Sequence, residues 1–454
     1  MLLRSERLLL LITAVVLVEK LLLASVLITP GRDVSELGFG FGGYVEGLLT
    51  QGQFAADDGD LCLRSSRMPG LPATVALLAQ VSRDWITVAL LKNALWSAGF
   101  AALAIYFARS VGDAGGRIRA VISVSMMVFS LSPALVKHAA MITYEEGFIT
   151  ELLILYAIAF LMTARAASSR SNPGRLGVAP ALVALLGVCL FMFKESMLPV
   201  FLAGVASVLV LVVRHGASRG ALVALAVAGS LTGGWAVRNH VVSGRFTPMT
   251  SYSGANFFRG ANTAGLELYP DVSLDRLWAG EQIVRRDGAI VDLPPLPTEV
   301  DFADEFAFSD HFRELGVAWI RAHPGLAWAF FRKKAANFFL STEMTPYRIG
   351  LEPAANEGWT RRAYRHGVAL WLVFGRILQV VFGCVLAHAI ARRLRGRAAT
   401  LVAALALIAC YATPSLIGFN YERHVSLYLL ILVVSLAMVA FGRADQREAA
   451  SAAA

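Results

Sequence analysis

Acidic and basic side chains gather in the short polar segments that separate long apolar stretches of this chain. The clearest of these groups are Glu145 with Glu146, Lys194 with Glu195, and Tyr421 with Arg423. Ionisable groups near bilayer depth are costly and usually face a cavity or a partner. Several cations that converge with several carboxylates suit a phosphate-bearing ligand and a general base. The alternative is that Lys194 and Glu195 only pair with each other or extend to water.

The polar segment at residues 29–85 also carries acids and bases close together. Those that bear on chemistry are Asp33, Glu36, Asp58, Asp60, Arg64 and Arg67. Loops held by a rigid scaffold are where binding and catalytic sites are often built. The alternative is a polar, solvated loop that contains the Pro-Gly turn at residues 69–72.

Residues 58–60 of this segment read Asp-Gly-Asp. This spacing is compatible with a divalent cation, because hard cations prefer oxygen ligands. It is also typical of a solvated turn, since Asp and Gly are favoured turn residues. The four cysteines form no CxxC pair and predict neither a disulfide framework nor a metal site. We therefore expect no cofactor, and a divalent ion held by Asp58 and Asp60 stays the open option.

Ten apolar segments must position these groups, and each is long enough to cross a bilayer, which takes about 20 residues. They span residues 8–28, 86–108, 120–140, 147–164, 177–193, 196–213, 220–237, 366–391, 398–417 and 424–441. With 57% hydrophobic residues and a mean hydropathy of +0.61, the composition excludes a soluble globular protein. The sequence thus predicts an all-α integral membrane protein.

The charges between the apolar segments alternate in sign bias. If the N-terminus is cytoplasmic, the inside segments are rich in Arg, and their only acids are Glu6, Asp113, Asp445 and Glu448. An excess of Lys and Arg over short loops sets cytoplasmic orientation. Both termini are then cytoplasmic, and the groups named above lie on the extracytoplasmic face. The net charge of +9 comes from these helix ends, so it does not indicate nucleic-acid binding; it suits anionic membrane lipids.

Three regions follow from this topology. Residues 1–237 form an N-terminal transmembrane module that includes the extracytoplasmic loop at 29–85. Residues 238–365 form an extracytoplasmic or interfacial region with amphipathic helices at 302–322 and 325–339. The second helix mixes aromatic and basic residues, which suits either a helix on the lipid headgroups or a small packed domain. Residues 366–454 contain the last transmembrane helices and a cytoplasmic tail.

Five short sequence motifs, in this order, resemble those of polytopic glycosyltransferases of the GT-C superfamily. The resemblance is greatest to the bacterial members, such as protein O-mannosyltransferases and the aminoarabinose transferase of lipid A. The motifs are LTQGQF at 49–54, RMPGLP at 67–72, ITYE at 142–145, WAVRN at 235–239 followed by GAN at 254–256 and 260–262, and YERH at 421–424. They cover the chain from about residue 30 to 440, and the enlarged first outside loop also fits this family.

The resemblance implies a GT-C-like bundle of about ten transmembrane helices in the plasma (inner) membrane. It also implies a sugar donor linked to a polyprenyl phosphate, an acceptor glycan, lipid or protein, and inversion at the sugar carbon. Arg67, Lys194, Arg238 and Arg423 would bind the donor phosphate. Glu145 would orient the acceptor, with Glu146, Asn239 and Tyr421 as further candidates.

The carboxylate that acts as general base in this family falls at about residue 37 or 38, where Leu37 and Gly38 stand. Glu36 is the nearest acid and our first choice, with Asp33 next. If no acid reaches the acceptor, the chain is a non-catalytic subunit with the same fold. A transporter or flippase of a lipid-linked or small substrate is the other alternative, although no inverted repeat is evident in the sequence.

Overall fold

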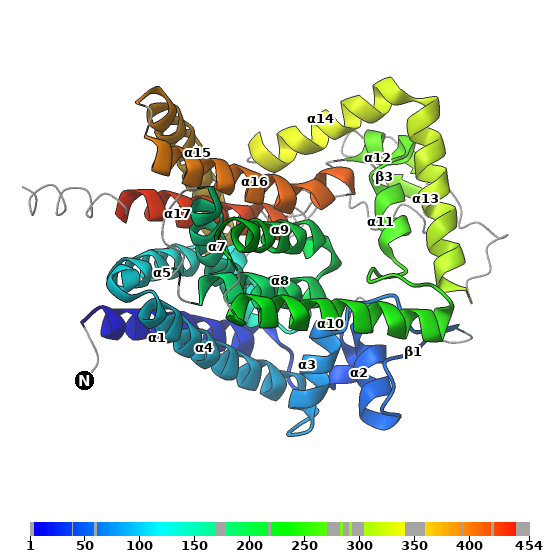
Figure 1. The fold of residues 1–454 in the computed structure, drawn as a ribbon. Helices are drawn as coiled ribbons and strands as arrows, with labels where there is room; N and C mark the ends of the chain where they lie inside the picture. The colour runs from blue at the N-terminus through cyan, green and yellow to red at the C-terminus, as the bar shows by residue number, and fades with distance from the viewer. Residues whose placement is uncertain are drawn as a thin grey trace, which may run out of the picture.

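The computed structural model of the chain is a bundle of long helices with shorter helices and two β-hairpins at one end (Figure 1). The structure describes residues 4–38, 40–58, 61–168, 176, 178–216, 219–269, 282–284, 290–292, 304–340, 359–392, 394–418 and 422–441. We call the end that carries the shorter helices the loop end, and the other the opposite end. The prediction of a helical fold is confirmed for this part of the chain.

Seven helices in the described residues are long and apolar enough to cross a membrane, which supports a multi-pass membrane protein. They correspond to α1 (Arg4–Leu27), α4 (Trp85–Ser110), α7 (Glu146–Ser168), α9 (Leu198–His215) with the short 3-10 helix before it, α10 (Arg219–Ser243), α15 (Trp359–Ala391) and α16 (Arg395–Ile417). Two further predicted spans form the helices α8 (Ala179–Phe193) and α17 (Glu422–Phe441), whose apolar parts are shorter.

The predicted span at residues 120–140 is not one helix. It forms α5 (Gly115–Ser130) and α6 (Pro133–Ala140), after the short 3-10 helix η2 (Gly112–Ala114). Ser132 caps α6 by accepting a hydrogen bond from the Leu135 backbone N–H, and Pro133 takes the first helical position. Proline suits a helix start but cannot continue a helix, because it has no N–H to donate. A new helix, α6, therefore begins after Ser132. It packs against α7, and its last residue, Ala140, comes shortly before the start of α7 in the chain.

The centre of the bundle is α7, which packs against α8, α9, α16 and α17. Its apolar side chains are almost all buried, and even Tyr156 is fully enclosed. A polar group lies in this core: Lys20 of α1 is 3.1 Å from Glu151 of α7, and both side chains are inaccessible. Burying a charge is tolerable only when it is paired and hydrogen-bonded, and Ser97 of α4 supplies a further partner for Lys20 at 2.8 Å.

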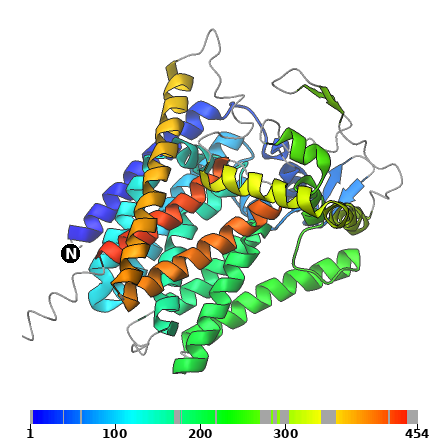
Figure 2. The ribbon, with the colours of Figure 1, turned by 90° about the horizontal axis from the view of Figure 1, so that it is seen from above.

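The loop end is built from two stretches of chain. The first contains η1 (Val34–Glu36), α2 (Phe41–Thr50), the antiparallel strands β1 (Ala56–Asp58) and β2 (Leu61–Leu63), and α3 (Gly70–Ala79). The second contains α11 (Ser253–Arg259), α12 (Thr263–Leu268), the antiparallel strands β3 (Gln282–Val284) and β4 (Ile290–Asp292), α13 (Glu305–Ala322) and α14 (Pro324–Leu340). The helices α13 and α14 confirm that both predicted segments are helical; α13 is clearly amphipathic, whereas α14 separates its apolar and polar residues only weakly. Figure 2 shows α14, in yellow, crossing the bundle at an angle to α16.

The two stretches are joined by Glu305 at the start of α13. Its carboxylate accepts hydrogen bonds from the backbone N–H groups of Arg64 and Ser65, and from the Ser251 hydroxyl at 2.8 Å. Ser251 N–H also donates to the Ser65 carbonyl at 2.9 Å. The loop before α3 and the chain before α11 therefore form one connected wall.

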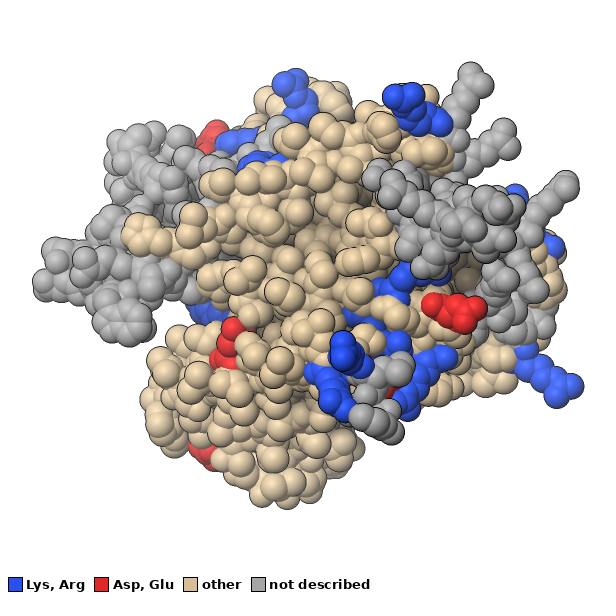
Figure 3. Space-filling view, turned by 90° about the vertical axis from the view of Figure 1, so that its left-hand side faces the viewer, with Lys and Arg blue, Asp and Glu red and all other residues tan. Residues whose placement is uncertain are grey.

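The opposite end is basic. Figure 3 looks onto this end and shows blue Lys and Arg side chains gathered there, with few acidic ones. Glu6 is buried and accepts hydrogen bonds from Arg109 at 2.9 and 3.0 Å, while Arg119 lies 3.6 Å away. The polar turns that the sequence places outside meet at the loop end, away from this basic end.

Candidate functional site

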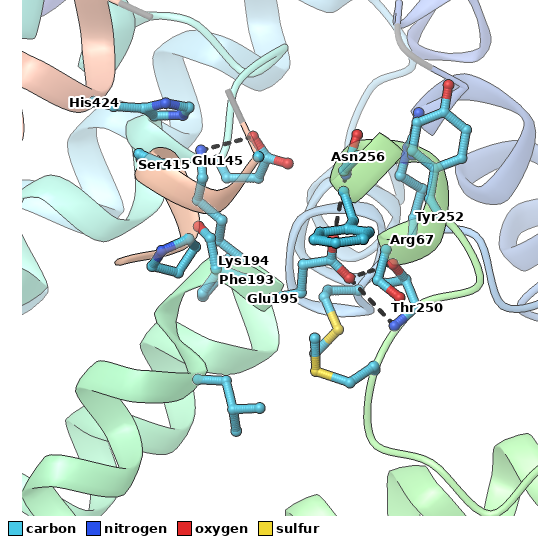
Figure 4. A pocket seen from close by; sticks show the side chains of 18 of the residues that line it. Arg67, Glu145, Phe193, Lys194, Glu195, Thr250, Tyr252, Asn256, Ser415 and His424 are labelled. Carbon is cyan, nitrogen blue, oxygen red and sulfur yellow. Dashed lines mark hydrogen bonds and ion pairs between the residues drawn. The ribbon is translucent and has the colours of Figure 1, made fainter. Parts of the chain in front are cut away.

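A cavity of about 430 Å³ opens at the loop end, and five parts of the chain line it (Figure 4). They are the loop and helix start around residues 41–68, the turn at 144–145, the α8–α9 junction at 193–199, residues 249–259, and the facing ends of α16 and α17. More of the lining is apolar than polar. Ligand sites typically combine an apolar wall with a few convergent polar groups.

Two arginines flank one tyrosine ring in this cavity. The Arg67 guanidinium lies 4.7 Å from the centre of the Tyr252 ring, and the Arg259 guanidinium lies 5.3 Å from it. Arg259 is almost fully buried and donates to Asn256 Oδ1 at 3.0 Å and to the Tyr252 hydroxyl at 3.1 Å. A planar guanidinium stacks on aromatic rings and offers a fork of donors to phosphate oxygens. Two guanidinium groups in this arrangement are chemically suited to bind an anion.

Arg67 is placed by its own loop. The preceding residue, Ser66, donates its backbone N–H to the Tyr44 hydroxyl at 2.9 Å, and the two hydroxyl groups are also 2.9 Å apart. Burial raises the pKa of Tyr44, so its hydroxyl stays protonated and can serve both contacts. Arg67 NH1 donates to the Ser66 carbonyl at 3.1 Å, and its guanidinium packs over the Phe41 ring at 5.4 Å.

Gly70 brings this loop against the end of α8. A Cβ atom added to Gly70 would lie only 2.7 Å from the Met192 carbonyl oxygen and 2.8 Å from the Phe193 ring. Real Cβ atoms do not approach other atoms so closely, so glycine permits the contact. Lys194 follows Phe193 directly, and the contact therefore holds the Arg67 loop next to the Lys194 turn.

Lys194 lies between two acids of the turn that begins α7. Its Nζ is 2.5 Å from Glu146 Oε1 and 3.8 Å from Glu145 Oε2. Glu146 is fully buried behind the cavity, and His424 Nε2 of α17 lies 3.8 Å from the same Oε1. Glu145 lines the cavity, and 21% of its side chain is accessible. Figure 4 shows Glu145, Lys194 and His424 on one side of the cavity and Arg67 with Tyr252 across from them.

Glu195 is a second carboxylate in the wall. It accepts hydrogen bonds from the Thr250 hydroxyl and backbone N–H and from Asn256 Nδ2 at 3.4 Å. Glu195 does not pair with its neighbour Lys194. Lys194 has an extended backbone, and the 3-10 helix η4 (Glu195–Met197) begins at Glu195, so the two side chains leave the chain in different directions. The alternative reading of the Lys194–Glu195 pair is therefore wrong: the two side chains point to different partners.

The acids preferred as general base lie elsewhere. Glu36 does not line the cavity; its side chain is 51% accessible, 3.7 Å from Arg32, and it closes the cap of η1. Asp33 accepts two hydrogen bonds of 2.9 Å from Arg83, and these hold the pKa of Asp33 well below its usual range. Both belong to a network of ion pairs on the surface. Of the three predicted catalytic carboxylates, Glu145 alone lines the cavity.

Arg238 and Asn239 hold the wall rather than line the cavity. Arg238 donates to the carbonyls of Phe54 and Arg64, at 2.6 and 2.5 Å, and its guanidinium packs against Phe54 and Trp235. Asn239 is fully buried and donates to the Thr247 carbonyl at 2.8 Å. The WAVRN motif thus fixes the first loop against α10, so the predicted contact of Arg238 with a phosphate does not follow from this geometry.

The remaining predictions fall partly outside the described residues. Tyr421 and Asp60 lie outside them. Asp58 ends strand β1 and Arg423 is in the first turn of α17, and the structure describes only the backbone of these two. No group of three or more His, Cys, Asp and Glu side chains in the described part of the chain is arranged to hold a metal ion. The divalent-ion option at Asp58 and Asp60 stays a prediction.

The sequence indicated some cavity residues without giving them a role. Asn256 and Arg259 follow the WAVRN motif closely, and His424 belongs to the last motif, so motif order was the signal that could have found them. Tyr252 and Thr250 had no signal in the sequence, because their role depends on the turn that precedes α11. Comparisons of the chain with protein families, with curated proteins and with solved structures found no match.

Proposed function

We propose that this protein is a membrane glycosyltransferase that moves a sugar from a polyprenyl phosphate to an acceptor hydroxyl. The observation that carries the proposal is the cavity, where the cations Arg67, Arg259 and Lys194 meet the carboxylates Glu145 and Glu195 at one end of a bundle of apolar helices. A lipid-linked phosphate needs both parts: cations for its head and an apolar path for its tail. The motif resemblance to GT-C glycosyltransferases points to the same chemistry.

In this proposal the phosphate lies against the arginine pair. Arg67 and Arg259 offer forked donors from both sides of Tyr252, and Lys194 adds a third positive charge. When the bond between the sugar carbon and the phosphate oxygen breaks, negative charge grows on the leaving phosphate. Fixed cations in a site of low dielectric stabilise such charge more than water does.

Glu145 is the proposed general base. It lines the cavity, it is partly accessible, and its carboxylate is 3.8 Å from Lys194. It would remove the proton from the acceptor hydroxyl as that oxygen bonds to the sugar carbon, which gives inversion. The products are the glycosylated acceptor, a polyprenyl phosphate and a protonated Glu145. A positioned base of this kind typically contributes about 10² to 10⁴ in rate.

The proposed orientation puts the cavity at the extracytoplasmic face of the plasma (inner) membrane. Its support is the unequal distribution of charge among the described residues: the opposite end carries Arg109 and Arg119, whose shared acidic partner is the buried Glu6. An excess of positive charge favours the cytoplasmic side. Both termini would then be cytoplasmic.

A transporter or flippase is the second candidate, and one observation favours it. The chain breaks between α5 and α6 at Ser132, and broken helices inside a bundle are a common feature of transporter binding sites. In the glycosyltransferase proposal the same break serves to bring the Glu145 turn to the cavity.

One experiment separates these functions. The purified protein is reconstituted in lipid vesicles with a fluorescent polyprenyl-phosphate sugar, and transfer to short acceptors and movement between leaflets are both measured. We expect transfer, lost in Glu145→Gln and retained in Glu36→Gln. Movement of the donor without transfer would support a flippase. Tight donor binding with neither activity would indicate a non-catalytic subunit.

A further inference from the structure

Two polar residues lie buried in α4, a helix long and apolar enough to cross a membrane, beside the turn that carries Glu145, and the proposed chemistry gives them no task. Lys92 is 1% accessible and Asn93 is inaccessible. Polar and charged groups inside membrane-spanning segments are expensive and are usually functional. Their contacts show what they do.

Both side chains bind the carboxyl end of α6. Lys92 Nζ donates to the carbonyls of Ala139 and, at 3.3 Å, Met141. Asn93 Nδ2 donates to the Ala140 carbonyl at 3.0 Å, and its Oδ1 accepts from Lys92 at 3.0 Å. The last carbonyls of a helix have no partner within the helix. Here three consecutive carbonyls of a helix that ends inside the bundle receive donors from one neighbouring helix.

The same face of α4 also holds the first turn of α7. Trp96 Nε1 donates to the Phe148 carbonyl at 2.9 Å, and Lys92 Nζ lies 5.1 Å from the centre of the Phe148 ring. A Cβ atom added to Gly147 would lie 3.0 Å from Lys92 Nζ and would overlap the Met141 carbonyl oxygen. The turn at residues 141–146 is thus held at both of its ends by one helical turn of α4.

We propose that Lys92 and Asn93 are positioning residues that fix the 141–146 turn, and with it the Glu145 carboxylate, against the cavity. The expected effect on kcat rests on the proposed function. The contact of α4 with the turn is a separate claim about the fold. Displacing a catalytic carboxylate by about 1 Å can lower the rate of the reaction on the order of 10²-fold.

The kinetic test uses Lys92→Met, which keeps length and loses the donors, with Asn93→Leu and Gly147→Ala as independent variants on the same contact. Ser97→Ala is the matched control, because it removes two buried hydrogen bonds of the same helix, to Lys20 and Glu151, that do not reach the turn. We expect kcat to fall by about 10²-fold in the three variants, with the KM for the donor within about twofold. The control should change neither value by more than about twofold.

A second readout does not depend on activity. In a cysteine-free background, Thr143→Cys is labelled with a trifluoromethyl group, and its fluorine NMR signal is compared with and without each variant. We expect the signal to shift or split in Lys92→Met and Gly147→Ala and to stay unchanged in Ser97→Ala. Melting temperatures check that each variant is folded; where Lys92→Met does not fold, Asn93→Leu and Gly147→Ala decide.

An unchanged signal in folded variants would overturn the inference, whatever the activity. A shifted signal with unaltered kcat would overturn it as well, because the turn would then move without consequence. If the signal shifts and the parent protein transfers no sugar, the proposed function fails and the placement of the turn by α4 stands.

Discussion

Two clusters of acids and bases at the loop end have the same composition and opposite character. In the first, Asp33 and Arg83 pair on the surface, with side chains 36% and 43% accessible. In the second, Glu145 and Lys194 meet in the wall of a cavity, at 21% and 10%. Residue types and motif order pointed to both clusters. Burial and neighbouring side chains therefore decide which of these acids faces a space that a ligand could fill.

The physical reason lies in the surroundings of each charge. Surface pairs are screened by water and contribute about 0–1 kcal/mol. The Asp33 and Glu36 carboxylates also have local tasks, because both close the cap of η1. In the cavity wall, the lower dielectric strengthens the electrostatic interactions of each charged group. Glu145 also lines the cavity, so its carboxylate faces the space that a ligand would fill.

The largest contrast is between the two candidate bases. Glu145→Gln keeps the shape of the side chain and removes the proton acceptor, so we expect transfer to fall by about 10² to 10⁴. Glu36→Gln should leave the rate within about twofold, because its carboxylate lies outside the cavity. Initial rates of sugar transfer measure both. Equal losses in the two variants would end the distinction between the clusters.

The next contrast is between two arginines. Arg67→Ala removes a forked donor from the cavity, and hydrogen bonds to charged groups contribute about 1.5–3 kcal/mol, or roughly 10- to 100-fold in affinity. Arg83→Ala should leave donor affinity unchanged. Titration of a polyprenyl monophosphate into the detergent-solubilised protein measures the dissociation constants. Arg67→Ala binding as tightly as the parent would remove the arginine pair from the phosphate site.

Arg238 sharpens the comparison, since it is a cation at the loop end that faces away from the cavity. Arg238→Met leaves the Phe54 and Arg64 carbonyls without these donors, which should cost about 1–3 kcal/mol of stability. We expect a lower melting temperature, with donor affinity in the folded protein close to that of the parent. A weakened affinity at unchanged stability would restore Arg238 to the phosphate site.

The smallest effect is the pH dependence of the surface pair. Arg83 depresses the pKa of Asp33 in the folded protein, so the pair stabilises the fold above the usual pKa of Asp and loses that contribution as the pH falls toward the folded pKa. The parent should exceed Asp33→Asn by less than about 1 kcal/mol at neutral pH. Melting temperatures taken downward from about pH 6 should begin to converge near about pH 4, the usual pKa of Asp, and meet as the pH reaches the lower folded pKa. A constant difference would contradict the ion pair.

Hydropathy predicted most of the long helices, because a long apolar run is a local feature of the sequence. The break at Ser132 was missed, since an apolar run does not show whether a Pro starts a new helix. In the site, Arg67, Lys194 and Glu145 were predicted and do line one cavity. Glu36 and Arg238 were placed by motif position, and only the packing of η1 and α10 shows that they point elsewhere. Tyr252 could not be predicted, because its place between Arg67 and Arg259 depends on the fold that brings Arg67, distant in sequence, to the same ring.

Gly70 has a consequence for how this site can vary. There is no space for a side chain between the Arg67 loop and the end of α8. Close contacts of the Gly70 backbone therefore set the spacing between the two segments that carry Arg67 and Lys194. Replacing the two charged side chains alone would leave that backbone spacing unchanged. Any residue larger than glycine at position 70 would therefore push the Arg67 loop away from the end of α8 and move the two cations apart.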